Sequence, residues 1–391
     1  MTEKLYYKDA YIKECEANVL DIIEKEGNVL VVLDKTPFYP EGGGQPSDIG
    51  TIDGIKVNYV SEQGETIYHH MEKAPKNKKV KCLIDFERRF DHMQQHSGEH
   101  LISGVIFKLY GGNNKGFHLG EEYVTLDIDI DHFSEDMIKK VEDEVNEYIY
   151  ANRSFDTYMV TKDEVDKVPA RKRINVDEDI RIVEAKDMDC CPCCGTHVKT
   201  TSEVGIVKIL KAERYKGMTR IYIKCGKRAL KDFQLKHDIV TNLNKALSVD
   251  ENGILDRVNK QFEEIEGLKR ESSRLKSILA GIEAENIIKN AKSKLISILI
   301  EDKSFEDIQL IGSIIENNGY IVILASLEEQ KILFLNNTDI DVSCGKLFKE
   351  HIKEFNGKGG GKDKRAQGTF DNKEDLTKFC QFLSMTVREK L

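Results

Sequence analysis

The chain lacks the long apolar run of a membrane protein and the leader of a secreted one. No stretch approaches the roughly 18 apolar residues that a membrane-spanning helix requires. Residues 1–20 mix Lys, Glu and Asp with apolar side chains, unlike a secretory signal. We therefore expect a cytoplasmic protein with no membrane partner.

A disulfide framework is also missing. The 391 residues include nine cysteines, an odd number, and four of them crowd into residues 190–194. A scattered, odd set is a poor basis for disulfides, whereas clustered thiols in a reducing compartment often bind metal. The pattern favours a reduced protein with a metal-binding segment near residue 190.

An overall positive charge is absent, because the formal net charge is −9. This argues against a whole-protein attraction to nucleic acid. Two segments are nevertheless basic: residues 206–228 hold eight cations and one anion, and residues 356–365 hold four cations and one anion among glycines. Local patches of this kind can bind phosphate. The alternative is a solvated strand face and an ordinary Lys-rich loop.

The length and composition support several folded domains. With 40% hydrophobic and 32% charged residues, the chain can bury cores and does not have a disordered composition. Its length suggests about two to four domains. In residues 1–88, short apolar runs such as Ile52–Val60 are separated by Gly, Asn and Pro, which predicts a β domain.

Residues 89–228 read as an α+β domain. A helix is predicted from a cap at Asp91 to Leu109, and a second helix from Ser134 to about residue 152. Strands are predicted at residues 156–160, 180–184, 204–210 and 219–224.

Residues 229–292 contain no proline and read as helical. Apolar and small residues recur at alternating spacings of three and four, which is the pattern of a heptad seam. The seam consists of Ile265, Leu268, Ser272, Leu275, Leu279, Ile282 and Asn286. We predict a helical hairpin or coiled coil that spaces domains or forms a homodimer; a simple packed helix pair is the alternative.

Residues 293–391 are predicted to form a small α/β domain. Residues 321–327 and 331–335 read as paired strands, and helices are predicted near 345–355 and 373–388. Between these helices lies a glycine-rich segment, Asn356–Lys362, which we expect to be a loop.

Two short segments offer metal ligands in matching pairs. His96 and His100 stand at i and i+4, as do Cys193 and His197. On a helix this spacing places both side chains on one face, roughly 6 Å apart. Three imidazoles and one thiolate form a normal ligand set for Zn²⁺. Each pair alone is weak evidence, but together they predict a metal site.

Two other metal chemistries compete with this assignment. The overlapping Cys190–Cys193 and Cys191–Cys194 pairs lack a partner pair elsewhere, so a structural four-cysteine zinc site is not favoured. The segment from His96 to His100 also fits the H-x-x-E-H pattern of inverzincin peptidases, with Glu99 as general base. Those enzymes take a further carboxylate ligand downstream, whereas this chain offers a Cys/His pair.

A third informative segment is Phe38–Pro46, which contains Gly42, Gly43, Gly44 and Gln45. Glycines allow backbone N–H groups to approach a ligand closely, and the Gln45 amide can donate and accept. The Lys-Ser/Thr ending of a phosphate-binding Walker loop is absent. A strand-to-strand turn is the equal alternative.

Taken together, these motifs resemble the alanyl-tRNA editing proteins, free-standing relatives of the alanyl-tRNA synthetase editing domain often called AlaX. The resemblance is carried by the glycine loop Gly42–Pro46, the two histidines, and Cys193–His197. Residues 218–230 resemble the end of that module. The tail resembles the DHH-associated domain of the same synthetases, through residues 359–361 and 366–368.

The resemblance implies an α+β multidomain fold: a β-barrel (1–88), a zinc-containing α+β editing domain (89–228), a helical coiled-coil segment (229–292) and a C-terminal α/β tRNA-binding domain (293–391). It implies one Zn²⁺ held by His96, His100, Cys193 and His197. The aminoacylation domain of the synthetases has no counterpart in the pattern, so charging of tRNA is not implied.

The activity implied by the resemblance is hydrolysis of tRNA(Ala) mischarged with serine and, in some members, glycine, which serves translation fidelity. The catalytic residues would be Gly43, Gly44 and Gln45. The substrate would be bound by Gly42, Lys358, Gly359, Gly360, Gly361, Lys362 and Arg365. A non-catalytic tRNA-binding module with a structural zinc is the alternative from a different class.

Overall fold

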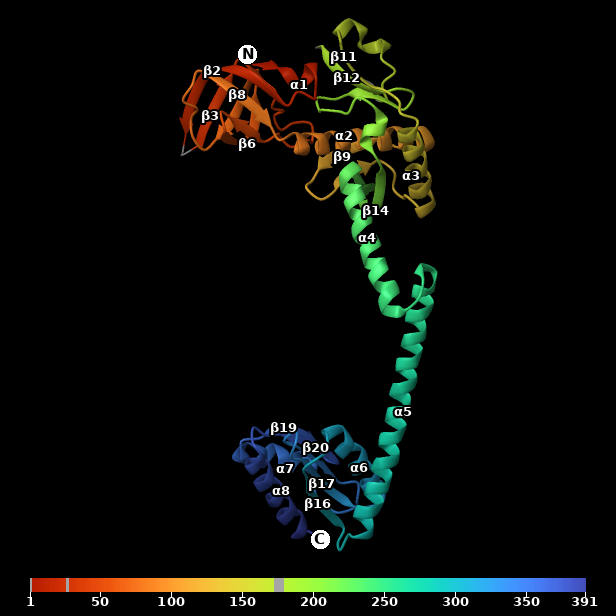
Figure 1. Cartoon of the computed structure of the whole chain (residues 1–391). Coiled ribbons are helices and arrows are strands. Elements are labelled where there is room, and N and C mark those ends of the chain that lie inside the picture. Colours follow the sequence, from red (N-terminus) through yellow and green to blue (C-terminus); the bar gives the residue numbers. More distant parts are fainter. Residues whose placement is uncertain (1, 26–27, 172–178) are drawn as a thin grey trace. The chain divides into compact units, whose positions relative to one another are not determined.

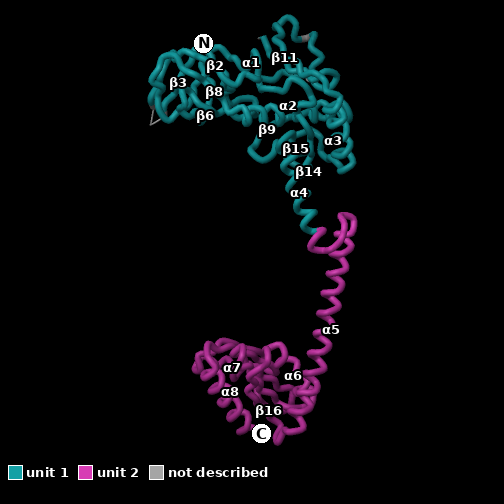
Figure 2. The backbone as a smooth tube through the Cα atoms, in the orientation of Figure 1, with its two compact units in different colours: residues 1–243 teal, residues 244–391 magenta. Residues whose placement is uncertain are grey.

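A computed structural model describes residues 2–25, 28–171 and 179–391 of the chain (Figure 1). The residue contacts divide it into two compact units, Met1–Leu243 and Asn244–Leu391 (Figure 2). Among the described residues, no helix is both long enough and apolar enough to cross a membrane. The finer division into four parts stays a prediction.

The first unit begins with a closed β-barrel. Its strands pair in the order β2-β3-β7-β6-β5-β8, and β8 pairs back with β2. Alternate residues of β8 point inward, as expected for a strand with one buried face. The barrel strands are β2 (Glu14–Lys25), β3 (Asn28–Leu33), β5 (Gly50–Ile52), β6 (Ile55–Gln63), β7 (Thr66–Met71) and β8 (Lys79–Ile84).

The predicted run Ile52–Val60 is wrong as a single strand. Asp53 and Gly54 have positive φ angles of 50° and 75°, so they form a tight turn between β5 and β6. Short elements beside the barrel complete this part: β1 (Glu3–Lys4), α1 (Leu5–Lys8) and β4 (Lys35–Thr36).

The central element of the first unit is helix α2 (Phe86–Tyr110). It begins six residues before the predicted start, because Asp85 rather than Asp91 accepts the capping hydrogen bond, from the Arg88 N–H. Gly111, at φ 71°, ends it after Tyr110, one residue beyond the predicted end at Leu109. Residues 92–106 are buried on every face, so α2 is a core helix and lacks the exposed face of an amphipathic one.

Two sheets surround α2. A four-stranded antiparallel sheet has the order β14-β15-β10-β9, and a three-stranded sheet has the order β11-β12-β13. The strands are β9 (Asn114–Leu119), β10 (Val124–Ile128), β11 (Phe155–Val160), β12 (Ile180–Ala185), β13 (Asp189–Pro192), β14 (Val207–Tyr215) and β15 (Met218–Cys225).

Helices complete the first unit. Ser134 caps α3 (Glu135–Tyr150), which confirms the predicted start. The strand predicted from Val204 starts later, because Thr201–Val204 form a 3-10 turn that ends at Gly205, with φ 82°. A second 3-10 turn covers Lys162–Lys167, and the long α4 (Gly226–Leu247) follows β15.

The second unit is a five-stranded sheet with helices on both faces. The strand order is β16-β17-β18-β20-β19, with β16 and β17 parallel. Helices α5 and α6 share one hydrophobic cluster with one face of the sheet, and α7 and α8 share another cluster with the opposite face. The strands are β16 (Leu295–Ile300), β17 (Ile321–Ser326), β18 (Lys331–Leu335), β19 (Lys358–Lys362) and β20 (Arg365–Thr369).

The helices of this unit are α5 (Ile254–Lys289), α6 (Phe305–Asn317), α7 (Cys344–His351) and α8 (Lys373–Arg388), with 3-10 turns at Glu251–Gly253 and Ile352–Phe355. The expectation of a glycine loop is wrong in one respect, because Lys358–Lys362 is the edge strand β19. Gly359 and Gly361 are required there, since an added Cβ would meet the β20 backbone.

Candidate metal centre

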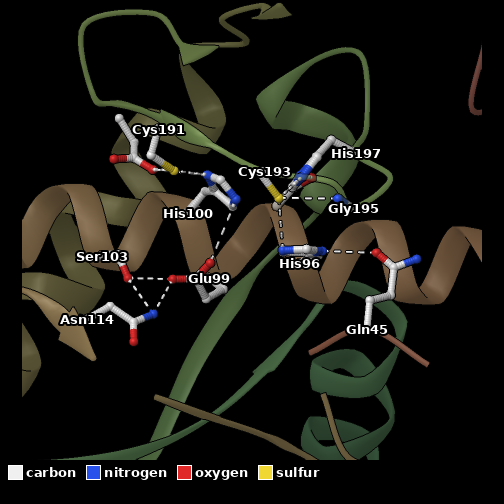
Figure 3. Close-up of polar contacts among 12 residues, drawn as sticks. Gln45, His96, Glu99, His100, Ser103, Asn114, Cys191, Cys193, Gly195 and His197 are labelled. Carbon is white, nitrogen blue, oxygen red and sulfur yellow. Dashed lines mark hydrogen bonds and ion pairs between the residues drawn. The ribbon is translucent and has the colours of Figure 1, made fainter. Parts of the chain in front are cut away.

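Four side chains from distant parts of the chain converge in the first unit (Figure 3). His96 and His100 project from α2, and Cys193 and His197 come from the segment after β13. One ligand atom from each lies within 4.8 Å of the others. Cys193 Sγ is 3.4 Å from His96 Nε2 and 3.3 Å from His197 Nε2. Bonds of about 2.0–2.3 Å place the ligands of tetrahedral zinc roughly 3.3–3.8 Å apart, so these residues fit such an ion.

The other nitrogen of each imidazole has its own partner. His96 Nδ1 is 2.9 Å from Gln45 Oε1, and His100 Nδ1 is 3.0 Å from Asp189 Oδ2. Both oxygens only accept, so both Nδ1 atoms donate, which leaves the Nε2 atoms as the nitrogens available to a metal. His197 Nδ1 lies 3.1 Å from the Ser97 hydroxyl. The three contacts orient the Nε2 atoms toward one point.

The charges around the cluster suit a cation. Burial raises the pKa of the Cys193 thiol, but His96 and His197 outweigh this and hold it well below its usual range. Burial lowers the pKa of His197 to about 3, so this imidazole is neutral and able to ligate. Burial also lowers the pKa of His100, but Cys191 and Asp189 outweigh this and raise it well above normal, so this imidazole carries a proton that a bound cation would displace.

The segment that carries Cys193 is shaped by close contacts. Arg181 donates through Nη1 to the carbonyls of Cys193 at 2.7 Å and Gly195 at 2.9 Å. The Gly195 N–H lies 3.3 Å from Cys193 Sγ, which favours the thiolate. A side chain at Gly195 would collide with the His96 ring, so only glycine fits there.

The glycine segment near residue 43 is a turn that positions the Gln45 side chain beside His96. Gly43 and Gly44 both have positive φ angles, 58° and 80°, and Gly42 and Gln45 exchange two backbone hydrogen bonds. Gln45 is fully buried and donates through Nε2 to Thr196 Oγ1 at 2.9 Å. The amide therefore links the turn, His96 and the Cys193 segment.

Helix α2 is fixed to the barrel by a buried ion pair. Arg89 donates to Asp48 from Nε at 3.0 Å and again from Nη2, and both side chains are fully buried. Arg89 also donates to the carbonyls of Ala10 and Pro37. These bonds hold the histidine-bearing helix against the part of the chain that carries Gln45.

The neighbouring thiols occupy different positions. Cys191 Sγ lies 3.6 Å from His100 Nδ1 and 3.5 Å from Asp189 Oδ2, on the side of His100 away from the four-ligand cluster. His100, Asp189 and Cys191 form a second group of potential ligands there. Cys194 is exposed and Cys190 is buried in a separate apolar cluster. Cys193 is thus the thiol that faces the three Nε2 atoms.

The basic segment 206–228 is not a free cationic surface. Seven of its eight cations form ion pairs, and Lys216 is the one for which the described residues show no carboxylate partner. The pairs are Lys208–Glu142, Lys211–Glu213, Arg214–Asp131, Arg220–Asp127, Lys224–Asp232, Lys227–Glu87 and Arg228–Asp91. The solvated-strand alternative is the better interpretation of this segment.

The second basic segment remains open to solvent. Lys358, Lys362 and Arg365 are exposed on β19 and β20. Gly360, midway along the edge strand, would meet nothing within 4 Å if it carried a Cβ. An exposed edge with cations and a bare backbone allows close approach of a ligand.

Sequence reasoning missed the residues that support the ligands. Asp189, Ser97 and Arg171 were not predicted, although Ser97 directly follows His96. Arg171 Nε donates to Asp189 Oδ1 at 2.8 Å. Burial raises the pKa of Asp189, but His100 and Arg171 outweigh it and lower that pKa. Ser97 and Asp189 lie close in sequence to a ligand, which was the available signal, whereas Arg171 is far from both motifs.

The comparisons with known families cover both units. Residues 180–222 match the "Threonyl and Alanyl tRNA synthetase second additional domain", residues 282–389 match the "DHHA1 domain", and residues 2–88 match "tRNA synthetases class II (A)". The fold and site therefore define a mixed α+β protein built from synthetase-related domains. The last match covers the barrel, so the likeness to the synthetases includes this part of the chain.

One curated relative matches nearly end to end. It is the alanyl-tRNA editing protein AlaX-L of Pyrococcus horikoshii, 36% identical over 96% of both chains. The alanine–tRNA ligases of Methanobrevibacter smithii and Pyrococcus abyssi are 31% and 29% identical over 96% and 99% of this chain. The chain spans only 44% and 43% of those ligases. The chain belongs to the AlaX-L family of alanyl-tRNA editing proteins.

Proposed function

We propose that the chain hydrolyses the ester of tRNA(Ala) mischarged with serine, with glycine as a second substrate amino acid. The observation that carries the proposal is the cluster of His96, His100, Cys193 and His197, with its atoms within 4.8 Å. It occurs in a chain that belongs to an editing family. An aminoacyl ester is already activated, so a modest catalyst is sufficient.

Zinc is the cofactor that we propose for this cluster. When bound, it supplies a Lewis acid that polarises a carbonyl or lowers the pKa of water toward about 7. The protein's own part is orientation. Gln45, Asp189 and Ser97 contact the Nδ1 atoms of the three imidazoles, on the side away from the proposed ion. We therefore assign Gln45 as a positioning residue and Gly43 and Gly44 to the turn that carries it.

Serine selection would follow from a polar group that must pair with the serine hydroxyl. Such a site rejects alanine strongly, because the buried group is left unpaired when the hydroxyl is missing. This predicts cleavage of Ser-tRNA(Ala) and sparing of Ala-tRNA(Ala).

The decisive experiment compares deacylation of Ser-tRNA(Ala) and Ala-tRNA(Ala) with and without a chelator. We expect serine-selective, chelator-sensitive hydrolysis. Cys193→Ala should abolish it, whereas Cys194→Ala, the matched control with an exposed thiol, should retain it. Equal, chelator-insensitive rates would refute the proposal. tRNA binding without hydrolysis would favour the non-catalytic module instead.

The second unit is proposed to hold the tRNA. Its exposed Lys358, Lys362 and Arg365, around Gly359–Gly361, support this role. Phosphate contacts by these cations would make binding fall steeply with salt.

A homodimer through α5 is proposed from its apolar seam. Leu268, Leu279 and Ile282 are 70%, 64% and 54% exposed, which is costly for a stripe of this size in a monomer. Leu268→Glu should convert a dimer to a monomer in light-scattering chromatography. Arg270→Glu, on another face of α5, is the control. A wild-type chain that is monomeric at high concentration would contradict the dimer.

A further inference from the structure

A buried carboxylate lies beside the cluster without being one of its four members. Glu99, on α2, is 5% exposed, and its Oε1 accepts from Ser103 Oγ and Asn114 Nδ2, both at 2.6 Å (Figure 3). Its Oε2 lies 3.8 Å from His100 Nε2, the nitrogen that faces Cys193. Among the described residues, Oε2 accepts no hydrogen bond.

The other buried carboxylate near the cluster is fully engaged. Asp189 accepts from Arg171 Nε through Oδ1 and from His100 Nδ1 through Oδ2. Both of its oxygens therefore face protein donors, and it lies behind His100, on the side away from the cluster. Glu99 is on the opposite side of the same imidazole, at the nitrogen that points to the cluster. The two carboxylates have different roles.

The free Oε2 restricts the chemistry of its partner. Since no described residue donates a hydrogen bond to this oxygen, it can accept one from a ligand that brings a donor. A negative charge repels phosphate, which excludes the RNA backbone from this position. The aminoacyl end of the proposed substrate offers a cationic donor: the α-ammonium, on the carbon next to the ester carbonyl.

We propose that Glu99 binds the α-ammonium group of the esterified amino acid. This inference rests on the proposed deacylase function and extends it to the recognition of a free amino group. The contact would hold the carbonyl beside the cluster, because ammonium and carbonyl carbon are separated by one atom. It would also make the enzyme spare esters whose amino group is blocked, such as peptidyl-tRNA.

A purely structural role for Glu99 is the competing explanation, since it ties α2 to β9 through Asn114. Glu99→Gln separates the two roles. The glutamine keeps an acceptor for Ser103 and Asn114 and removes only the charge. Ser103→Ala is the matched control, because it removes one support of Oε1 and leaves the charge in place.

The test measures kcat and KM for seryl-tRNA(Ala) and for the same tRNA carrying N-acetylserine, together with metal content per chain. Wild type should prefer the free amine by roughly 10- to 100-fold in kcat/KM, the range expected for one charge-assisted hydrogen bond. Glu99→Gln should lose this preference by acting more slowly on seryl-tRNA alone. Ser103→Ala should keep it, and all three proteins should bind equal metal.

The outcomes are distinct. A wild type that cleaves neither ester refutes the proposed function itself. A wild type that cleaves both esters equally, or a Glu99→Gln variant that keeps the preference, overturns the ammonium site while leaving the deacylase in place. Loss of metal in Glu99→Gln also overturns the inference, because the carboxylate would then belong to the metal centre.

Discussion

Ser97 lies between the two histidine ligands in sequence, yet its hydroxyl contacts the third imidazole, His197. Gln45 contacts the His96 imidazole from 51 residues away, and Asp189 contacts the His100 imidazole from 89 residues away. The ligands alone leave each ring free to rotate, whereas a partner at Nδ1 selects the orientation and the tautomer. Single residues outside the ligand set therefore determine whether the ligand nitrogens are oriented to bind an ion.

The role of Asp189 gives a first prediction. Asp189→Asn removes the charge that holds His100 and Arg171, so zinc affinity should fall about 10- to 100-fold. Competition with a chromogenic chelator measures this change. Asp187→Asn, an exposed carboxylate two residues away, should leave affinity unchanged. Equal affinity in Asp189→Asn and wild type would contradict the role given to this carboxylate.

His69, in the barrel, gives a prediction on pH. Burial lowers its pKa to about 4, while Val31 O and Thr36 Oγ1 hold its two nitrogens. Between pH 6.5 and 4 the unfolded chain binds this proton and the folded chain does not. Acidification through that window should therefore lower the free energy of unfolding by about 3 kcal/mol from this group. The stability is fully present above pH 6.5.

Urea unfolding followed by circular dichroism at pH 7 and pH 4.5 measures this loss. His69→Gln should show a smaller drop between the two pH values, whatever its stability at pH 7. The informative quantity is the change in the free energy of unfolding between the two pH values, because other buried histidines contribute equally to it in both proteins. An unchanged drop in the variant would show that His69 does not titrate in this way.

At the scale of elements, the structure depends on turns and helix surroundings that spacing does not reveal. The glycines at residues 43 and 44 allow the positive φ angles of a two-residue turn. The glycines at residues 359 and 361 allow β19 to approach the β20 backbone closely. Helix α2 has buried residues on all sides because helix α3, two sheets and the Cys193 segment enclose it. Each element is shaped by what packs on it.

The turn gives an element-scale prediction. Gly44 has φ 80°, and an added Cβ would stand 2.6 Å from the Phe117 ring and 2.8 Å from its carbonyl oxygen. Gly43 has φ 58° with nothing within 4 Å. Gly43→Ala should lower the free energy of unfolding by about 1 kcal/mol, because alanine is strained in the left-handed backbone. Gly44→Ala should lower it more, because its Cβ would also collide with Phe117. Thermal denaturation compares them, and equal losses would contradict the packing explanation.

At the scale of the whole molecule, the proposed chemistry and the proposed RNA contact fall in different units. The four candidate ligands and their supports all lie in Met1–Leu243, and the exposed cations of β19 and β20 lie in Asn244–Leu391. The basic segment of the first unit is neutralised by its own carboxylates. RNA affinity is therefore expected to depend on the second unit.

Truncation tests this division. A chain that ends at Val249, before the 3-10 turn, should keep its zinc and a kcat close to that of the full chain. Its KM for Ser-tRNA(Ala) should rise at least about 10-fold, because the phosphate contacts are lost. Steady-state deacylation with full-length tRNA measures both constants. An unchanged KM would remove the second unit from tRNA binding.

The sequence by itself determined the features that are local along the chain. The pairs His96/His100 and Cys193/His197, the cap at Ser134 and the strands near residues 321–335 follow from spacing and side-chain type, because helix and strand periodicity are properties of short segments. Only the tertiary structure decided which groups meet across long separations. Gln45 behind His96, Glu99 beside the cluster and the ion-paired segment 206–228 depend on the path of the chain, which brings together residues as far as 192 positions apart, such as Tyr11 and Glu203.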